Sequence, residues 1–106
     1  MVTQEALTTR GVLQAQTIDH KFREYHERHP EVYQHLVLFA RRVKARGHER
    51  YSISALFERV RWHLDIEKGD EPFKIDNIYR SRYARLIMER EPDLKDFFEL
   101  RELRAA

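Results

Sequence analysis

The stretch ISALFERVRWHLDI, residues 53–66, decides the fold class of this chain. Five of its apolar residues keep the spacing of one side of an α-helix: Ile53, Leu56, Phe57, Val60 and Leu64. At 100° per residue, Trp62 and Ile66 fall on the opposite side, close to Arg59. Apolar residues on both sides indicate a central helix that is covered on two faces, or one whose second face binds a partner.

Helical periodicity continues on both sides of this stretch. One helix is predicted from residue 17 to about His29, where Pro30 disfavours a helical residue before it. Pro30 suits the first turn of the next helix, predicted at about 30–46, and Gly47 suits its C-terminal cap. Ser52 or Ser54 is the expected N-cap of the central helix.

Two more helices are predicted towards the C-terminus. The first is capped by Asp76 or Asn77, and its core side is expected to carry Ile78, Tyr79, Tyr83, Leu86 and Ile87. The second begins at Pro92 and packs through Leu94, Phe97, Phe98 and Leu103. The fold class that follows is all-α: a single small domain of four to five helices at residues 17–106, after a loose or partly helical tail at residues 1–16.

Composition excludes several classes of protein. The 106 residues contain no cysteine, which removes disulfides, thiolate catalysis and cysteine-bound zinc. The N-terminal stretch lacks the basic and apolar regions of a signal peptide. No apolar run approaches the roughly 20 residues that span a bilayer. We therefore expect no membrane partner and a cytoplasmic location.

Positive charge is concentrated in two blocks, although the net charge is only +2. Residues 41–63 carry seven basic and two acidic side chains, and residues 80–90 carry four and one, whereas residues 64–79 carry two and five. With Tyr79 taken as the centre of the core side, Ser81, Ala84 and Arg85 point outward between Arg80 and Arg82. Arginine presents a fork of donors that suits phosphate and guanine edges.

These blocks supply the candidate nucleic-acid-binding residues: Arg80, Ser81, Arg82 and Arg85, with Arg41, Arg42, Arg59 and Arg61 on the two preceding helices. Two helices compete for the role of reading helix. A helix-turn-helix needs a turn of three or four residues, and Gly47–Tyr51 comes closest to that length. The length of this turn favours the central helix as the reading helix, whereas the outward arginines favour the helix at residues 80–90.

Catalytic and metal-binding patterns are weak. His20, His26 and His29 do not form a recognised zinc motif, and we interpret them as solvated or capping side chains. The acids Asp70 and Glu71 with Lys74 depart from the spacing of nuclease sites, because two residues, one of them proline, separate the second acid from the lysine. We expect no enzyme activity, no catalytic residue, no metal, no cofactor and no small-molecule substrate.

Three patterns together resemble small uncharacterised proteins encoded by bacteriophages and prophages: F-x-x-Y-H-x-x-H-P-x-V-Y at residues 22–33, L-x-E-R-V-R-W at 56–62 and F-K-I-x-N-x-Y-x-S-R-Y-A-R-L at 73–86. The resemblance covers about residues 22–104. It implies a phage-related cytoplasmic setting and brings no activity with it.

The leading hypothesis is a small helical nucleic-acid-binding protein of the phage-regulator type. The alternative is a protein-interaction module, either a homodimer or an inhibitor of a host protein, with Trp62 and Ile66 at the interface. A large aromatic side chain beside an apolar neighbour is costly to leave in water. Trp62 is therefore expected to be at least half buried, inside one chain or in a symmetric contact.

Overall fold

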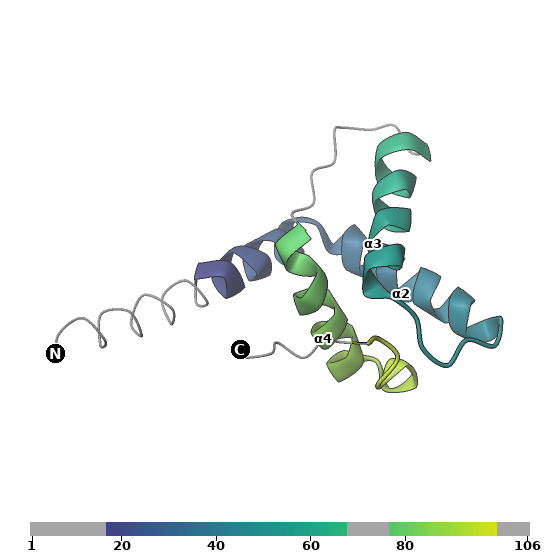
Figure 1. The fold of residues 1–106 in the computed structure, drawn as a ribbon. Helices are drawn as coiled ribbons and strands as arrows, with labels where there is room; N and C mark the ends of the chain where they lie inside the picture. Colours follow the sequence, from purple (N-terminus) through teal and green to yellow (C-terminus); the bar gives the residue numbers. More distant parts are fainter. Residues whose placement is uncertain (1–16, 68–76, 100–106) are drawn as a thin grey trace, which may run out of the picture. The chain divides into compact units, whose positions relative to one another are not determined.

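The computed structural model describes residues 17–67 and 77–99 of the chain (Figure 1). The chain divides into two compact units, Met1–Pro30 and Glu31–Ala106, and each is described by itself. The predicted tail at residues 1–16 lies outside the described residues. In the first unit a helix extends over residues 17–28. The His29 N–H donates to the Tyr25 carbonyl at 2.9 Å, and the predicted end near His29 is confirmed.

Three α-helices follow, and they confirm the all-α class. They are α2 (Pro30–Ala45), α3 (Ile53–Trp62) and α4 (Arg80–Arg90). A π-helical turn, His63–Glu67, continues α3, and short 3-10 turns at Asn77–Tyr79 and Pro92–Leu94 precede and follow α4. Among the helices of residues 17–67 and 77–99, none is long and apolar enough to cross a membrane.

The connection between α2 and α3 has the predicted cap residues. Gly47 has φ of 100°, a conformation that favours glycine, and its N–H donates to the Lys44 carbonyl at 3.0 Å. The Ser52 hydroxyl accepts a hydrogen bond from the Ala55 N–H at 3.3 Å, so Ser52 is the N-cap of α3. The connection occupies residues 46–52, which is longer than the turn of a strict helix-turn-helix.

The start of α4 differs from the expectation. Asn77 was predicted as one of two alternative caps, but it belongs to a 3-10 turn, and Tyr79 occupies the N-cap position without a side-chain cap bond. Asp76, the other alternative, lies outside the described residues. The Asn77 side chain instead accepts a hydrogen bond from Arg61, which shows that a tertiary contact has taken the place of a local cap.

The predicted fifth helix is wrong within the described residues. After the 3-10 turn Pro92–Leu94, Lys95 has ψ of 131°, outside the helical region, and Asp96 has φ of 61°, a left-handed conformation that interrupts an α-helix. The chain then runs extended beside Tyr51, whose N–H donates to the Phe97 carbonyl at 3.0 Å. An isolated parallel bridge joins Tyr51 and Phe98.

The core of the second unit is built by the apolar sides of α2, α3 and α4 and closed by the C-terminal segment. Its fully buried large side chains include Val32, Leu36, Phe57, Val60, Tyr83, Ile87 and Leu94. Phe97 and Phe98 are buried as well, so the predicted packing of this segment holds although its helix does not form. Leu103 lies outside the described residues. The α3 stripe from Ile53 to Leu64 is buried throughout, as predicted.

Candidate nucleic-acid interface

The orientation of α4 differs from the one predicted. Ala84, which was expected to face outward, is fully buried together with Tyr83 and Ile87. The buried side of the helix is therefore centred among these three residues, and Tyr79 lies at its edge. The prediction took Tyr79 as the centre, which rotated the expected outer face. Ser81 is only half-buried, and Arg85 is exposed.

Arg80 consequently faces α3 and does not belong to an outer face. Its Nη1 donates to the Ser54 hydroxyl at 3.2 Å, and its Nε donates to the Asn77 carbonyl at 3.2 Å. Arg61, on α3, donates from Nη2 to the Asn77 side-chain oxygen at 2.8 Å. Asn77 therefore binds two guanidinium groups at the junction of α3 and α4.

Arg82 also reaches back to this junction, because its Nη1 lies 3.4 Å from the Ile78 carbonyl oxygen. Arg85 makes no hydrogen bond or ion pair in the part of the chain that the structure describes. We call Arg61, Arg80 and Arg82 with Asn77 the junction cluster. The structure thus brings three of the predicted arginines together, but around the 3-10 turn at Asn77–Tyr79 instead of on one helix face.

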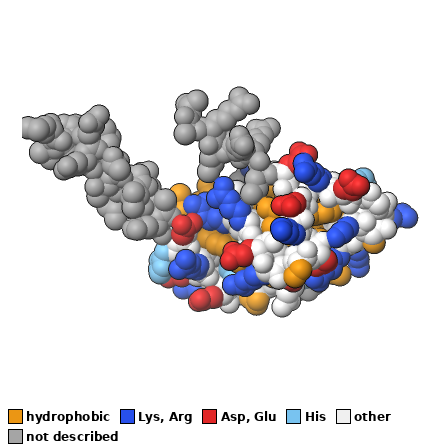
Figure 2. All heavy atoms as spheres, turned by 90° about the horizontal axis from the view of Figure 1, so that it is seen from below, with side chains coloured by type: hydrophobic (Ala, Val, Ile, Leu, Met, Phe, Trp, Pro, Cys, Tyr) orange, Lys and Arg blue, Asp and Glu red, His pale blue; other side chains and the backbone are white. Residues whose placement is uncertain are grey.

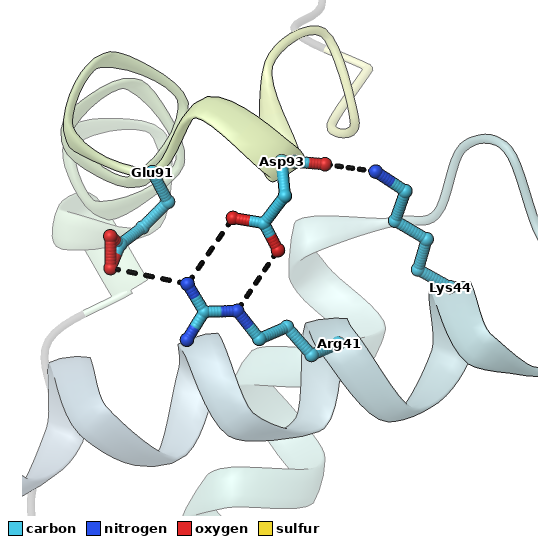
Figure 3. Close-up of polar contacts among 4 residues, drawn as sticks. All are labelled: Arg41, Lys44, Glu91 and Asp93. Carbon is cyan, nitrogen blue, oxygen red and sulfur yellow. Dashed lines mark hydrogen bonds and ion pairs between the residues drawn. The ribbon is translucent and has the colours of Figure 1, made fainter.

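Arg41 lies apart from this cluster and is held by acidic groups (Figure 3). Its Nε and Nη2 donate to the two Asp93 carboxylate oxygens at 3.0 and 3.2 Å, and Nη2 lies 3.5 Å from Glu91 Oε1. Lys44 Nζ donates to the Asp93 carbonyl. These contacts tie α2 to the 3-10 turn after α4. Arg41 is therefore compensated inside the chain.

Arg42 and Arg59 meet at one aromatic ring. Their guanidinium carbons lie 5.6 and 5.1 Å from the ring centroid of Phe39, so both make cation–π contacts with the same side chain. Arg59 Nη2 also lies 3.2 Å from Glu67 Oε1. The sequence did not indicate this pairing, because Arg59 and Phe39 belong to different helices.

Two carboxylates are favoured in their charged form. The hydrogen bond from Arg41 holds the pKa of Asp93 below its usual value, and the Arg41 pKa rises correspondingly. The hydrogen bond from His63 lowers the pKa of Glu67, and the positive charge of Arg59 adds to the effect. Each shift adds stability at neutral pH, because the folded chain prefers the ionised carboxylate.

We expect the effect of Asp93→Asn on stability to diminish in acid. A carboxylate whose pKa is lower in the folded chain stabilises the fold above its unfolded pKa, about 3.9, and this contribution disappears as the pH falls through the folded value. The difference in melting temperature between wild type and Asp93→Asn should therefore narrow below about pH 4. A constant difference from neutral pH into this acid range would contradict the expectation.

Asp96→Asn is the matched control for this experiment, because Asp96 lies three residues further along the same loop. Asp96→Asn removes a carboxylate that has no ion pair in the described part of the chain, and asparagine also tolerates the left-handed conformation. Melting curves of both variants over the same pH range separate the Arg41 pair from the general effect of removing a negative charge.

The histidines do not assemble a metal site among residues 17–67 and 77–99. His29 contacts the Tyr25 ring at a centroid distance of 4.6 Å. The rings of His35 and His63 lie 4.7 Å apart, and their Nδ1 atoms lie 2.7 Å from the Glu31 carbonyl oxygen and 2.6 Å from Glu67 Oε2. The acids Asp70 and Glu71 lie outside the described residues, so the expected absence of a metal stays a prediction.

Trp62 and Ile66 are exposed in the single chain. Each retains 56% of its accessible surface, and they are the most exposed of the large apolar residues that the structure describes. Trp62 is therefore less than half buried within one chain, so the prediction that it is buried inside the monomer is wrong. The other predicted alternative, burial in a symmetric contact, stays a prediction.

Charges of both signs are mixed on the face of the molecule that Figure 2 draws. Figure 2 shows lysine and arginine intermingled with aspartate and glutamate on the face that is drawn, with apolar side chains between them. Sequence analysis missed three partners that decide which arginines are compensated: Asn77, Asp93 and Phe39. Asp93 lies 52 residues beyond Arg41, and Asn77 lies 16 beyond Arg61. Phe39 contacts Arg59 from a different helix. Local spacing carries no signal for these pairs.

No protein-family model, no curated protein and no solved structure matches this chain. The resemblance to phage-encoded proteins therefore stays a prediction.

Proposed function

We propose that the protein binds nucleic acid through the arginines of α4, as a small non-enzymatic regulator of the phage-related type in the bacterial cytoplasm. The observation that carries the proposal is a difference in charge compensation: carboxylates neutralise Arg41, whereas Arg80 and Arg85 have no carboxylate partner in the described part of the chain. In the described part of the chain Arg80 bonds only neutral oxygens and Arg85 bonds none, whereas Arg41 contacts two carboxylates. Phosphate is a ligand that compensates such charges through bidentate hydrogen bonds.

The position of these arginines supports the same conclusion. Arg61, Arg80 and Arg82 all contact oxygens of Asn77 or Ile78, directly before the first turn of α4. The N-terminus of a helix already carries a partial positive charge, and the guanidinium groups beside it raise the local potential further, although Glu58 offsets part of the Arg61 charge at 3.4 Å. An anion placed there is stabilised by the guanidinium groups and by the helix dipole together.

The acid-paired arginines have a secondary role in this proposal. Arg41 and Arg59 can contact phosphate only by exchanging Asp93 and Glu67 for it, which cancels part of the gain. Exposed ion pairs contribute little to stability, so the exchange costs little, but it releases a carboxylate that repels the phosphates. Arg80, Arg82 and Arg85 bear most of the binding on this view, with Arg42 and the Ser81 hydroxyl beside them. Arg61 contributes less, because its Nη1 lies 3.4 Å from Glu58 Oε1.

The salt dependence of binding tests the proposal. The affinity of a protein for duplex DNA falls with salt on logarithmic axes with a slope of about −0.9 for each phosphate that is neutralised. We expect Arg82→Gln/Arg85→Gln to flatten the slope by about 1.8 and to weaken binding by roughly tenfold per arginine at about 0.1 M salt. Gel shifts on duplex and single-stranded probes over a range of salt give both quantities.

The matched control is Arg41→Gln/Arg59→Gln, which removes the same two charges from acid-paired arginines. Its slope should stay close to that of the wild type. If both double variants flatten the slope equally, binding reflects net charge and the assignment to α4 is wrong. If the wild type gives no shift at about 50 mM salt, where non-specific binding is strong, nucleic-acid binding itself is wrong.

The second candidate function is a protein-interaction module. One observation favours it: Trp62, the last residue of α3, and Ile66, in the π-helical turn that follows, are both exposed. A contact made there involves no residue of α4, so the two candidates are compatible and can be tested separately.

A further inference from the structure

α3 is covered on two flanks and leaves a third face exposed. On one flank, the Arg59 guanidinium carbon and the His63 ring centroid lie 5.1 and 5.6 Å from the ring centroid of Phe39 on α2. On the other flank, Arg61 and Ser54 bond residues at the junction with α4. The outer face of α3, as we call the remaining side, consists of five exposed residues: Ala55, Glu58, Trp62, Asp65 and Ile66.

Trp62 and Ile66 supply the apolar surface of this face. They lie four residues apart, across the point where α3 passes into the π-helical turn His63–Glu67, and each retains 56% of its accessible surface. Large apolar side chains that stay in water together are typical of interaction sites, because a partner that covers them removes the cost of their hydration. π-Helical turns are rare and occur frequently at functional sites, which supports the same interpretation.

The charged residues of the outer face are both acidic. Glu58 is partly compensated, because its Oε1 lies 3.4 Å from Arg61 Nη1. Asp65 makes no hydrogen bond or ion pair in the described part of the chain. It follows Trp62 by three residues, which makes the two side chains neighbours on a helix surface. An uncompensated carboxylate therefore lies beside the exposed tryptophan.

The position of Asp65 in its helix adds to the need for an external cation. α2 and α4 end with basic side chains, which suit the negative C-terminal end of the helix dipole. The π-helical turn that continues α3 has no lysine or arginine and carries Asp65 and Glu67 instead. Glu67 is paired with Arg59 and His63 at 3.2 and 2.6 Å, whereas Asp65 has no such partner among the described residues. A cation from outside relieves the repulsion between Asp65 and the dipole.

The sign of these charges selects the occupant. Nucleic acid suits the outer face poorly, because its phosphates carry the same charge as Glu58 and Asp65. A second copy that docks through the same face opposes acidic side chains to acidic ones, and the face has no basic residue to pair with them. A protein segment with lysine or arginine beside apolar side chains complements both the charge and the apolar surface.

We propose that the outer face of α3 binds a basic amphipathic helix of another protein. Apolar side chains of that helix cover Trp62 and Ile66, and one of its lysine or arginine side chains lies between the indole ring and the Asp65 carboxylate. A cation at that position makes a cation–π contact and an ion pair at the same time. This inference rests on the second candidate function, protein interaction. It is independent of nucleic-acid binding, because none of its residues lies in α4.

Titration with two synthetic peptides tests the sign of the partner. One peptide repeats leucine and lysine at helical spacing, and the other has glutamate in place of every lysine, so the two share the same apolar side chains. Trp62 is the only tryptophan of the chain, and its fluorescence therefore reports this face. The lysine peptide should move the emission to shorter wavelength in a saturable manner, and the glutamate peptide should leave it unchanged. No change with the lysine peptide, or equal changes with both, overturns the proposal.

Charge reversal at Asp65 tests the ion pair. Asp65→Lys should weaken binding of the lysine peptide by about tenfold, because it replaces an attraction by a repulsion, and it should allow the glutamate peptide to bind. Glu49→Lys is the matched control: Glu49 is also exposed and without an ion pair among the described residues, but it precedes α3, whereas Trp62 ends it. Equal weakening in both variants would mean that binding follows net charge, and the assignment to this face would be wrong.

A second pair of variants tests the apolar contact. Ile66→Ser should weaken binding of the lysine peptide by about fivefold or more, because the peptide then covers a polar side chain. Leu38→Ser changes a 45% exposed residue of α2 in the same manner and should leave binding unchanged. Similar losses in the two variants would place the peptide on another surface and would overturn the proposal.

Two further measurements separate this inference from the proposed functions. Sedimentation of the wild type without peptide should show a monomer. A dimer that Ile66→Ser abolishes would support protein interaction but would make a second copy the occupant, and the basic partner would be wrong. Gel shifts of the same variants test nucleic-acid binding independently, since a change on the outer face of α3 should leave the contribution of α4 intact. Circular dichroism verifies that each variant is folded, so a loss of peptide binding reports the contact itself.

Discussion

Phe57→Ala should lower the free energy of unfolding by about 3–5 kcal/mol, because it leaves a cavity at the centre of the second unit. Phe57 is completely buried on α3. Its ring lies 6.2 Å from the ring of Tyr83 on α4, and the guanidinium carbon of Arg61 lies 5.9 Å from its centroid. A domain of this size is stable by only about 5–15 kcal/mol. If the stability of this domain lies near the lower value, the loss approaches its entire free energy of unfolding.

Urea titration followed by circular dichroism measures this loss. Leu38→Ala is the control, because Leu38 is 45% exposed on α2 and its truncation should cost less than about 1 kcal/mol. Similar losses in both variants would show that Phe57 is not the packing centre that its burial indicates.

Phe97→Ala should also cost about 3–5 kcal/mol, although Phe97 lies in a segment without regular secondary structure. The side chain is 2% exposed, and its ring lies 5.4 Å from that of Phe98. The backbone at the same position accepts the hydrogen bond from Tyr51. The segment therefore belongs to the cooperative core, and the variant should unfold in a single transition at lower denaturant.

Glu99→Ala provides the control for this second variant, since Glu99 is exposed two residues further on and its replacement should change stability by less than about 0.5 kcal/mol. A loss below about 1 kcal/mol for Phe97→Ala would contradict the prediction. So would a separate early transition, because it would mean that the segment detaches before the helices unfold.

The helices of the second unit were predictable because their determinants are local. The stripe from Ile53 to Leu64, the cap at Ser52 and the glycine after α2 each act within a few residues. α2 begins at Pro30 and ends at Ala45, within one residue of the prediction. Where local signals agree in this manner, periodicity is sufficient to locate an element.

The predictions failed where a distant contact competed with a local signal. Proline followed by aspartate favours a helix start at residue 92, but the left-handed backbone at Asp96 ends that helix after one turn. The extended segment that follows buries Phe97 and Phe98, and this burial favours it over a continued helix. The position of Ala84 was predicted wrongly for another reason: the prediction centred the core side on Tyr79, whereas the buried side is centred among Tyr83, Ala84 and Ile87.

The candidate site was predictable only in part. The sequence identified the arginines, but their partners decide which charges stay uncompensated, and these partners are distant. Asp93 lies 52 residues beyond Arg41, and Asn77 lies 16 beyond Arg61. The exposure of Trp62 follows from the position of α3 between α2 and α4, since both neighbours approach its flanks and neither covers its outer face.

The bridge between Tyr51 and Phe98 cannot form until both residues have been synthesised, so the core closes late during synthesis. Ribosomes add roughly 5–20 residues per second, so the 47 residues that separate the two partners (98 − 51) take about 2–10 s to appear. Throughout that interval the nascent chain holds α2 and α3 with no C-terminal segment to close their core. The apolar surface that Leu94, Phe97 and Phe98 later cover is then open to chaperones or to other nascent chains, and a shortened product that ends before residue 94 should be recovered mainly as aggregate or bound to a chaperone.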